Sequence, residues 1–380
     1  MRATQARIYL SHVKHNIAEI QKIAPNSKIC LSVKANAYGH GAVEIAKAAV
    51  TSGISIFSVA TVAEGIELRQ AGIVGSILLL SICHKDEINQ IAEYQLTPLV
   101  ADSEFVDLLA DVAGKNNDSD DSYPVHIKID TGMARHGCRP EDAAQLAVHC
   151  VKKGLRIEGL CTHLAVSDSL NDEDIAFTKK QIAIFNTAVC AVKAKDISVD
   201  MLHCTASAGI LLYPEAHFDM VRPGILTYGY FPSQELHNFF RQKKDFAVFK
   251  PVMELISAVS AVKTLHLGES VSYGRCWTAK TQTNIATLPI GYADGLQRKL
   301  SPGLFITIDR KKYPIIGRIC MDQCVVDIGI EHNIKRWDEV IIFGPREYCN
   351  TAQDIAMQLD TIPYEILCFV SSRVCRTYMR

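Results

Sequence analysis

The segment KICLSVKANAYGHGAVEIAKAAV (28–50) joins a short apolar run to a longer amphipathic stretch. Its first part, ICLSV (29–33), is almost continuously apolar, as expected of a strand that is buried on both faces. Its second part, GAVEIAKAAV (41–50), has the apolar spacing of a helix. A buried strand followed by a helix is the repeating unit of parallel α/β folds, so we expect residues 28–50 to form one such unit.

The same alternation continues to about residue 225. Short apolar runs recur at 29–33, 54–59, 76–81, 96–100, 125–130, 157–162, 198–203 and 218–222. Eight strand–helix units within about 200 residues predict a (β/α)8 barrel of the TIM type. A doubly wound open sheet is the alternative, and the number of strands disfavours it.

After Gly229 the pattern changes to short strands without long helices. The predicted strands lie at 252–265, 283–289, 305–309, 314–316, 325–328 and 340–343, with one short helix at 351–359. This pattern predicts a mainly β C-terminal domain. We therefore assign residues 1–240 to the barrel and 247–380 to the β domain, with the boundary in 231–246. The first few residues are candidates for pairing with the C-terminal domain, and the polar segment 115–122 is predicted to be a loop.

Composition excludes several classes of protein. The 380 residues are 48% hydrophobic and 21% charged, which is typical of a globular chain. Lys and Arg number 40 against 41 Asp and Glu, so no basic field favours nucleic acid or an anionic membrane. The 13 cysteines form no CxxC pairs, and the CxxxC spacing of Cys320 and Cys324 is a weak metal signal. We expect a reduced cytoplasmic protein without a metal, a signal peptide or a membrane span.

Polar side chains gather at the predicted C-terminal ends of the barrel strands, where barrels carry their active sites. They are Lys34, Arg135, His136, His163, Ser207 and Arg222. Lys34 follows an apolar strand, where lost hydration would lower its pKa and make its amine a nucleophile for carbonyl compounds. The alternative is a lysine paired with a neighbouring carboxylate. Each residue alone has an ordinary explanation, but together they predict a site.

The segment SVKANAYGHG (32–41) resembles the pyridoxal-phosphate lysine motif of bacterial alanine racemases. Further segments resemble motifs of the same family, in the same order: KIDTGMARHG (128–137), THLA (162–165), VRPGILTYG (221–229), VSYGR (271–275), IGYADG (290–295), GRICMDQ (317–323) and PYEILC (363–368). The resemblance implies a (β/α)8 barrel followed by a mainly β domain. It also implies a homodimer with shared active sites that uses pyridoxal 5′-phosphate to interconvert L-alanine and D-alanine for bacterial peptidoglycan.

The resemblance assigns a role to individual residues. Lys34 would bind the cofactor covalently and act as one base, and Tyr273 of the partner subunit would act as the other. Arg222 would face the pyridine nitrogen, with His163 hydrogen-bonded near Arg222 and Tyr273, and Arg135 would lie beside the phenolic oxygen of the cofactor and the substrate. The cofactor phosphate would be held by a further set: Tyr38, Ser207, Tyr364 and the backbone amides of Gly224 and Ile225.

Three other assignments concern the substrate and a modification. Met321 and Asp322 of the partner subunit would border the substrate carboxylate, and Tyr292 would lie at the entrance. Lys128 matches a position that is carbamylated in some members, where the carbamate would brace Arg135. Simpler alternatives remain: Tyr273 as a strand tyrosine, Asp322 and Tyr292 as turn residues, and Lys128 as an outward-facing strand residue.

The chain departs from the family pattern at three positions. Ala134 stands where many members have glycine, a change that we expect to cost little, and Leu164 stands where phenylalanine is commoner. Ala206 replaces an asparagine before the phosphate serine, which removes a polar group near the phosphate.

Other functions stay open: a serine or broader amino-acid racemase, a barrel decarboxylase that uses the same cofactor, and a non-enzymatic cofactor carrier. Arg222 disfavours the decarboxylase, which should carry an acidic partner for the pyridine nitrogen.

Overall fold

The computed structural model describes residues 2–116, 122–243 and 246–380. Eight strands form one sheet in which each strand pairs in parallel with the next, in the order β8-β7-β6-β5-β4-β3-β2-β9. They are β2 (Lys28–Ser32), β3 (Ile56–Val59), β4 (Ser76–Leu79), β5 (Thr97–Val100), β6 (Tyr123–Lys128), β7 (Leu155–Cys161), β8 (Met201–His203) and β9 (Met220–Val221). The Asp219 N–H donates to the Leu202 carbonyl (3.2 Å) and brings the two ends together. The predicted (β/α)8 barrel is confirmed.

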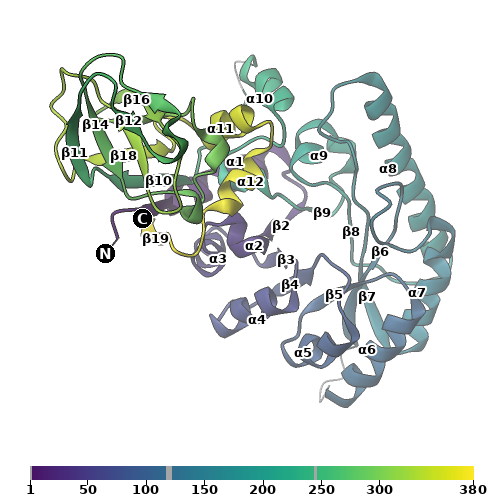
Figure 1. Ribbon diagram of the computed structural model, residues 1–380. Coiled ribbons are helices and arrows are strands. Elements are labelled where there is room, and N and C mark those ends of the chain that lie inside the picture. The colour runs from purple at the N-terminus through teal and green to yellow at the C-terminus, as the bar shows by residue number, and fades with distance from the viewer. Residues whose placement is uncertain (1, 117–121, 244–245) are drawn as a thin grey trace.

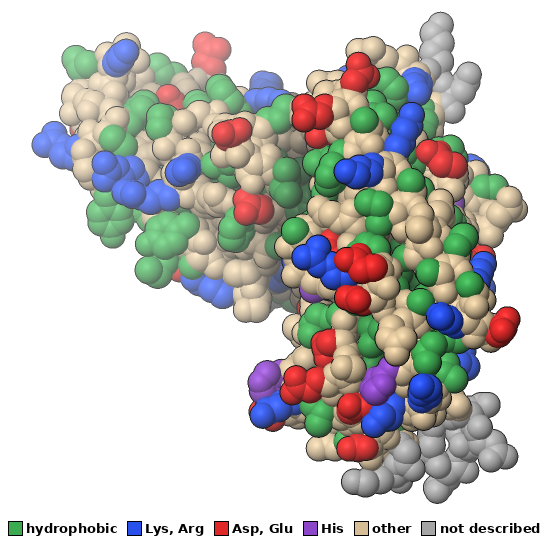
Figure 2. Space-filling view, turned by 90° about the vertical axis from the view of Figure 1, so that its right-hand side faces the viewer, with side chains coloured by type: hydrophobic (Ala, Val, Ile, Leu, Met, Phe, Trp, Pro, Cys, Tyr) green, Lys and Arg blue, Asp and Glu red, His purple; other side chains and the backbone are tan. Residues whose placement is uncertain are grey.

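Helices cover the outside of the barrel (Figure 1). They are α1 (Leu10–Ile23), α3 (Ala42–Val50), α4 (Val62–Gln70), α5 (Ile88–Glu93), α6 (Ser103–Asn116), α7 (Ala143–Lys152), α8 (Asp172–Lys193) and α9 (Ser207–Leu212). In α3 the buried residues include Ala42, Ile45, Ala46 and Ala49, the spacing of a single helical face. Figure 2 shows charged side chains of both signs interspersed on the barrel's outer face, as the balanced composition predicts.

The C-terminal part forms a nine-stranded sheet in the order β11-β14-β17-β16-β15-β18-β10-β1-β19. Its strands are β1 (Gln5–Tyr9), β10 (Met253–Ala258), β11 (Ala261–Leu265), β14 (Thr283–Leu288), β15 (Phe305–Ile308), β16 (Lys311–Ile316), β17 (Cys324–Asp327), β18 (Glu339–Phe343) and β19 (Cys375–Met379). β1 pairs with both β10 and β19, so both ends of the chain join this sheet (Figure 1). A two-stranded ribbon, β12 (Ser270–Val271) and β13 (Trp277–Thr278), lies beside it with α10 (Gln234–Arg241), α11 (Ala352–Leu359) and α12 (Pro363–Phe369).

Two of the strand predictions differ from the structure. The predicted strand at 252–265 is wrong, because β10 and β11 lie at different places in the sheet and Val259 and Ser260 pair with separate partners between them. The last barrel strand is shorter than 218–222, since Phe218 has a φ of +47°. Of the predicted loop at 115–122, residues 117–121 lie outside the described residues, as do 244–245 of the boundary segment. None of the helices in the described ranges combines the length and apolar character needed to cross a membrane.

Candidate active site

Lys34 begins α2 (Lys34–Tyr38), a turn with an unusual backbone. The four residues after it, Ala35 to Tyr38, all have φ near +52° and form a left-handed turn. Each such L-residue costs roughly 1–2 kcal/mol, so contacts elsewhere must hold the turn. Glu64 at the start of α4 accepts the Ala35 N–H (2.7 Å), and a Cβ at Gly39 would lie 2.4 Å from the Leu367 carbonyl of α12. The turn is therefore fixed by both the barrel and the β domain.

The Lys34 side chain opens into a cavity of about 330 Å³ at the C-terminal ends of the barrel strands. Its lining includes four cationic side chains, Lys34, Lys128, Arg135 and Arg222, and the lining residues that the structure describes include no Asp or Glu. Burial lowers the pKa of Lys34, and the positive charges of Arg135 and Arg222 lower it further, against an opposing effect of Glu64. The cavity thus suits an anionic ligand and supplies a nucleophilic amine.

One wall of this cavity is rich in hydroxyl groups and contains a glycine. The backbone N–H of Gly224 donates to the Ser207 hydroxyl (3.0 Å), and a Cβ at Gly224 would lie 2.4 Å from the Tyr38 hydroxyl. Tyr38 and Tyr364 are neighbours, with ring centroids 5.8 Å apart, and burial raises the pKa of Tyr38 to about 12. Ile225 is fully buried and follows Gly224 at the start of a 3-10 turn. Neutral hydroxyls beside the backbone amide of a residue that has no Cβ form a site that fits a phosphate.

Arg222 is 6% exposed and is held by neutral acceptors. Its Nη2 donates to the carbonyls of Thr162 (2.9 Å) and Cys204 (3.1 Å) and contacts His163 Nδ1 at 3.3 Å, while Nη1 donates to His203. Burial and the Arg222 charge hold the pKa of His163 well below its usual range, so this imidazole is neutral. The guanidinium therefore keeps its full positive charge at the cavity floor.

Lys128 and Arg135 enter the cavity from β6 and the loop that follows it. Lys128 is 4% exposed and donates to the Ile129 carbonyl (3.3 Å), and burial lowers its pKa. The alternative that Lys128 is an outward-facing strand residue is therefore wrong. Asp130 shapes the loop by accepting the N–H groups of Gly132 (3.0 Å) and Ala134 (3.1 Å).

Ala134 has a φ of +55°, a conformation that glycine adopts more easily than alanine. Ala134→Gly should therefore raise the free energy of unfolding by roughly 1 kcal/mol. Urea denaturation measures the change. Ala194→Gly is the matched control, because exposed Ala194 has a φ of −68° and the same substitution there should not stabilise the protein. A lower stability of Ala134→Gly would contradict this reading.

The remaining predicted residues lie together, but away from this cavity. Tyr273, Met321 and Asp322 line a separate hollow of the β domain that shares no lining residue with the Lys34 cavity. Tyr273 is 72% exposed, and Figure 1 shows β12, which leads into it, far from the barrel strands. Tyr292 joins this group, because its N–H donates to the Cys320 carbonyl (3.1 Å). A single chain therefore presents two separate clusters of predicted site residues.

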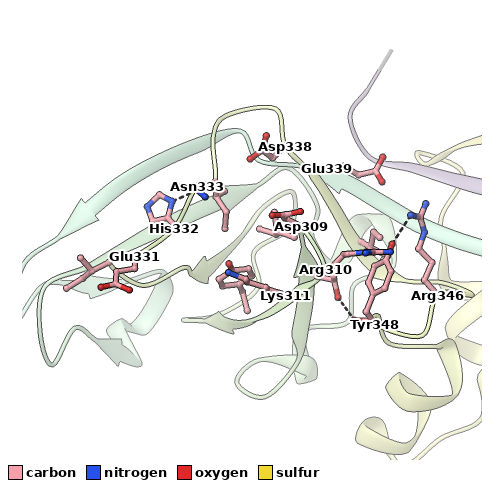
Figure 3. A pocket seen from close by; sticks show the side chains of 16 residues that line it. Asp309, Arg310, Lys311, Glu331, His332, Asn333, Asp338, Glu339, Arg346 and Tyr348 are labelled. Atoms are coloured by element: carbon pink, nitrogen blue, oxygen red, sulfur yellow. Dashed lines mark hydrogen bonds between the residues drawn. The ribbon is translucent and has the colours of Figure 1, made fainter.

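A larger cavity of about 930 Å³ lies in the β domain (Figure 3). Its side chains carry both charges, and several of them are satisfied locally: Arg346 Nη1 donates to the Tyr348 hydroxyl (2.9 Å), and His332 accepts the Ile334 N–H (3.1 Å). Among the described residues of this lining, no hydrogen bond joins a nucleophilic side chain to a base. Size alone therefore does not make it the active site.

Sequence reasoning missed three polar residues that organise the site. Glu64 holds the Lys34 turn, and His203 with His126 lies behind Arg222. The signal for the two histidines was present, since each interrupts an otherwise apolar barrel strand in VHIKID (125–130) and MLHC (201–204). Glu64 carries no such signal, because a glutamate in the first turn of a helix is an ordinary capping residue.

Comparisons with known proteins identify the family of this chain. The family models for the N-terminal and C-terminal domains of alanine racemase match residues 8–232 and 252–378. Proteins named alanine racemase from Treponema denticola and Treponema pallidum are 49% and 43% identical to this chain, with all of it covered and 99% and 100% of theirs. The structure of alanine racemase from Clostridium difficile 630 has a TM-score of 0.90 at 35% identity, covering 100% of this chain and 96% of that one. The chain belongs to the alanine racemase family.

Proposed function

We propose that this chain is an isomerase that interconverts L-alanine and D-alanine with pyridoxal 5′-phosphate, and that it supplies D-alanine for bacterial peptidoglycan from the cytoplasm. The observation that carries the proposal is the cavity of about 330 Å³ in which Lys34, a hydroxyl-lined wall and Arg222 converge. The names of the relatives support the choice of alanine.

The residues present fit this cofactor. Lys34 would hold it covalently through its amine, while Tyr38, Ser207, Tyr364 and the amides at Gly224 and Ile225 would bind its phosphate. Arg135 and Arg222, which also line the cavity, would balance its negative charges. When bound, it supplies an electron sink that acidifies the Cα–H of an amino acid. Ala206 contributes no polar group beside Ser207, so Tyr38 and the Gly224 amide would carry more of the phosphate binding.

Racemisation requires a proton to leave one face of the substrate and another to arrive on the opposite face. The Lys34 amine, whose pKa is lowered by burial and by its cationic neighbours, suits one face. Tyr273 of the partner subunit would serve the other, with His163 hydrogen-bonded nearby.

Arg222 favours racemisation over related reactions. A guanidinium stays protonated and cannot transfer a proton to the pyridine nitrogen. The ring then remains a weaker electron sink than it would be beside a carboxylic acid. This disfavours decarboxylase and aminotransferase chemistry, which is why we rank the barrel decarboxylase lower. The β domain, from residue 247 onward, would be unexplained in a simple cofactor carrier.

The remaining residues concern the substrate and the dimer. We propose a homodimer in which Met321, Asp322 and Tyr292 of the partner subunit close the substrate site. The exposure of Tyr273 and Met321, at 72% and 53%, supports a partner that covers them. Tyr364 and the small cavity favour alanine over larger amino acids, although serine is close enough in size to be the second candidate. Carbamylated Lys128 would place a negative charge beside Arg135.

The test is to follow both alanine enantiomers by chiral chromatography, with and without added pyridoxal 5′-phosphate. Either enantiomer should approach an equal mixture only when the cofactor is present. Serine tested in parallel separates the broader racemase, and release of CO2 with ethylamine would identify the decarboxylase. If the cofactor binds and neither enantiomer changes, the proposed activity is wrong.

A further inference from the structure

A row of four side chains crosses the interior of the barrel behind Arg222. Arg222 Nη1 donates to His203 Nδ1, and His203 Nε2 lies 2.8 Å from His126 Nδ1. His126 Nε2 in turn lies 3.0 Å from the Glu158 carboxylate. His203 and His126 are 0% and 2% exposed, so no solvent intervenes along the row. A charged cavity floor is thereby connected to a carboxylate on another strand.

The arginine fixes the direction of every proton in this row. A guanidinium can only donate, so His203 Nδ1 must be the acceptor and carries no proton. A neutral imidazole keeps one proton, which therefore lies on Nε2 and is donated to His126 Nδ1. His126 must then carry its own proton on Nε2 and donate it to Glu158. The row thus accommodates one proton on each histidine, at Nε2, and a second proton on either would face another donor.

The barrel strands are shaped to hold this row. The pairing of β6 with β7 runs from Val125 with Ile157 to His126 with Gly159, so Glu158 is the extra residue of a β-bulge. Bulges redirect side chains, and this one turns Glu158 toward His126. A Cβ at Gly159 would lie 2.3 Å from His126 Nδ1, so only glycine leaves room for the ring. The bulge at Glu158 and the absence of a side chain at Gly159 therefore both allow the hydrogen bond between His126 and Glu158.

Glu158 lies at the opposite end of the barrel from the active cavity. It lines a separate cavity of about 590 Å³ with residues at the starts of β4, β5 and β6. Burial acts to raise the pKa of Glu158, but the hydrogen bond that it accepts from His126 and the positive charge of Arg156, at 3.4 Å, together lower it. Glu158, His126 and His203 are all absent from the lining of the Lys34 cavity, and the side-chain hydrogen bonds of this row reach that lining at Arg222.

We propose that Glu158, through His126 and His203, is a positioning residue that fixes the orientation of the Arg222 guanidinium toward the cofactor ring. The proposal rests on the proposed function, because it concerns what Arg222 does to that ring. An anion at the end of a directed row polarises each hydrogen bond and makes His203 Nδ1 a stronger acceptor. A guanidinium fixed in this way would stay directed at the ring nitrogen when the cofactor is bound.

The first test uses the full-length protein labelled with ¹⁵N-histidine. Long-range ¹H–¹⁵N spectra distinguish the two neutral tautomers from imidazolium and need no catalytic activity. His126 and His203 should both be Nε2–H tautomers, assigned by comparison with His126→Gln and His203→Gln. An Nδ1–H tautomer or an imidazolium at either position would overturn the directed row, whether or not the proposed function is correct.

The second test compares Glu158→Gln with Glu93→Gln, a loss of the same charge from the lining of the same distal cavity. Glu158→Gln should lower kcat, counted per bound cofactor, about tenfold and leave KM nearly unchanged, as substitutions of outer hydrogen-bond partners do. Pyruvate formed per racemisation should rise, because an uncapped ring nitrogen can take up a proton and favour transfer of the substrate amino group to the cofactor. Glu93→Gln should show neither effect.

Gly159→Ala should reproduce both effects without a change of charge, since its methyl group displaces the His126 ring. The ratio of pyruvate to racemisation does not depend on how much of the protein is folded, so a loss of stability alone would leave it unchanged. Equal behaviour of Glu158→Gln and Glu93→Gln would overturn the proposal. If the wild-type protein binds the cofactor but does not racemise alanine, the proposed function fails, and the tautomer spectra still test the row.

Discussion

Lys34→Ala should abolish covalent attachment of pyridoxal 5′-phosphate and lower racemisation by roughly 10³-fold or more, because one side chain supplies both the attachment and a base. Borohydride reduction of the wild-type protein followed by peptide mass analysis should place the cofactor on Lys34. The same treatment of Lys34→Ala should leave no adduct. The physical basis is the lowered pKa of an amine that burial and two arginines disfavour as a cation.

Lys28→Ala is the matched control for this substitution. Lys28 is the exposed first residue of β2, the strand that leads to Lys34, and its substitution should remove neither the adduct nor activity. Any general effect of removing a lysine from this segment would appear in both variants. An adduct on a different lysine in the wild-type protein, or an active Lys34→Ala, would contradict the assignment of Lys34.

The barrel could be predicted from sequence because its strands are buried on both faces and separated by helices. The apolar runs at 29–33 and 157–162, for example, fall on β2 and β7. Periodicity reports burial, however, and carries little information about where a strand lies in a sheet. It therefore merged β10 with β11, whose alternation is continuous although the chain leaves one part of the sheet for another. The pairing of β1 with β19 depends on contacts between the two ends of the chain.

The residues that line the candidate site could be predicted from the sequence more readily than their geometry. Lys34 and Arg222 follow apolar strands, and that placement brings them into one cavity. The left-handed turn after Lys34 was beyond prediction, because no local preference of Ala35 or Ala37 favours a positive φ. The conformation is imposed by Glu64 and α12, which are distant in sequence. The bulge at Glu158 likewise arises from the pairing of two strands.

Tyr273 poses a different problem, because no single chain brings it to the Lys34 cavity. It lies in a separate hollow of the β domain and is largely exposed. If the active site is shared between two chains, each site combines Lys34 of one chain with Tyr273 of the partner subunit. If it is not shared, Tyr273 has no role in catalysis or must move to its own barrel. Mixing inactive variants distinguishes these cases.

Lys34→Ala and Tyr273→Phe should each be nearly inactive alone and should regain activity when their subunits exchange. A hybrid dimer with shared sites has one site carrying both substitutions and one carrying neither, because a two-fold dimer has two equivalent sites. Random exchange of equal amounts makes half of the dimers hybrid, so about a quarter of the wild-type activity should return. Lys34→Ala mixed with Arg222→Ala is the control: both substitutions affect the cavity of a single chain, so every site stays damaged and no activity should return. With hybrids confirmed by native mass spectrometry, absence of recovery from the first mixture would reject the shared site and leave Lys34 without the proposed second base.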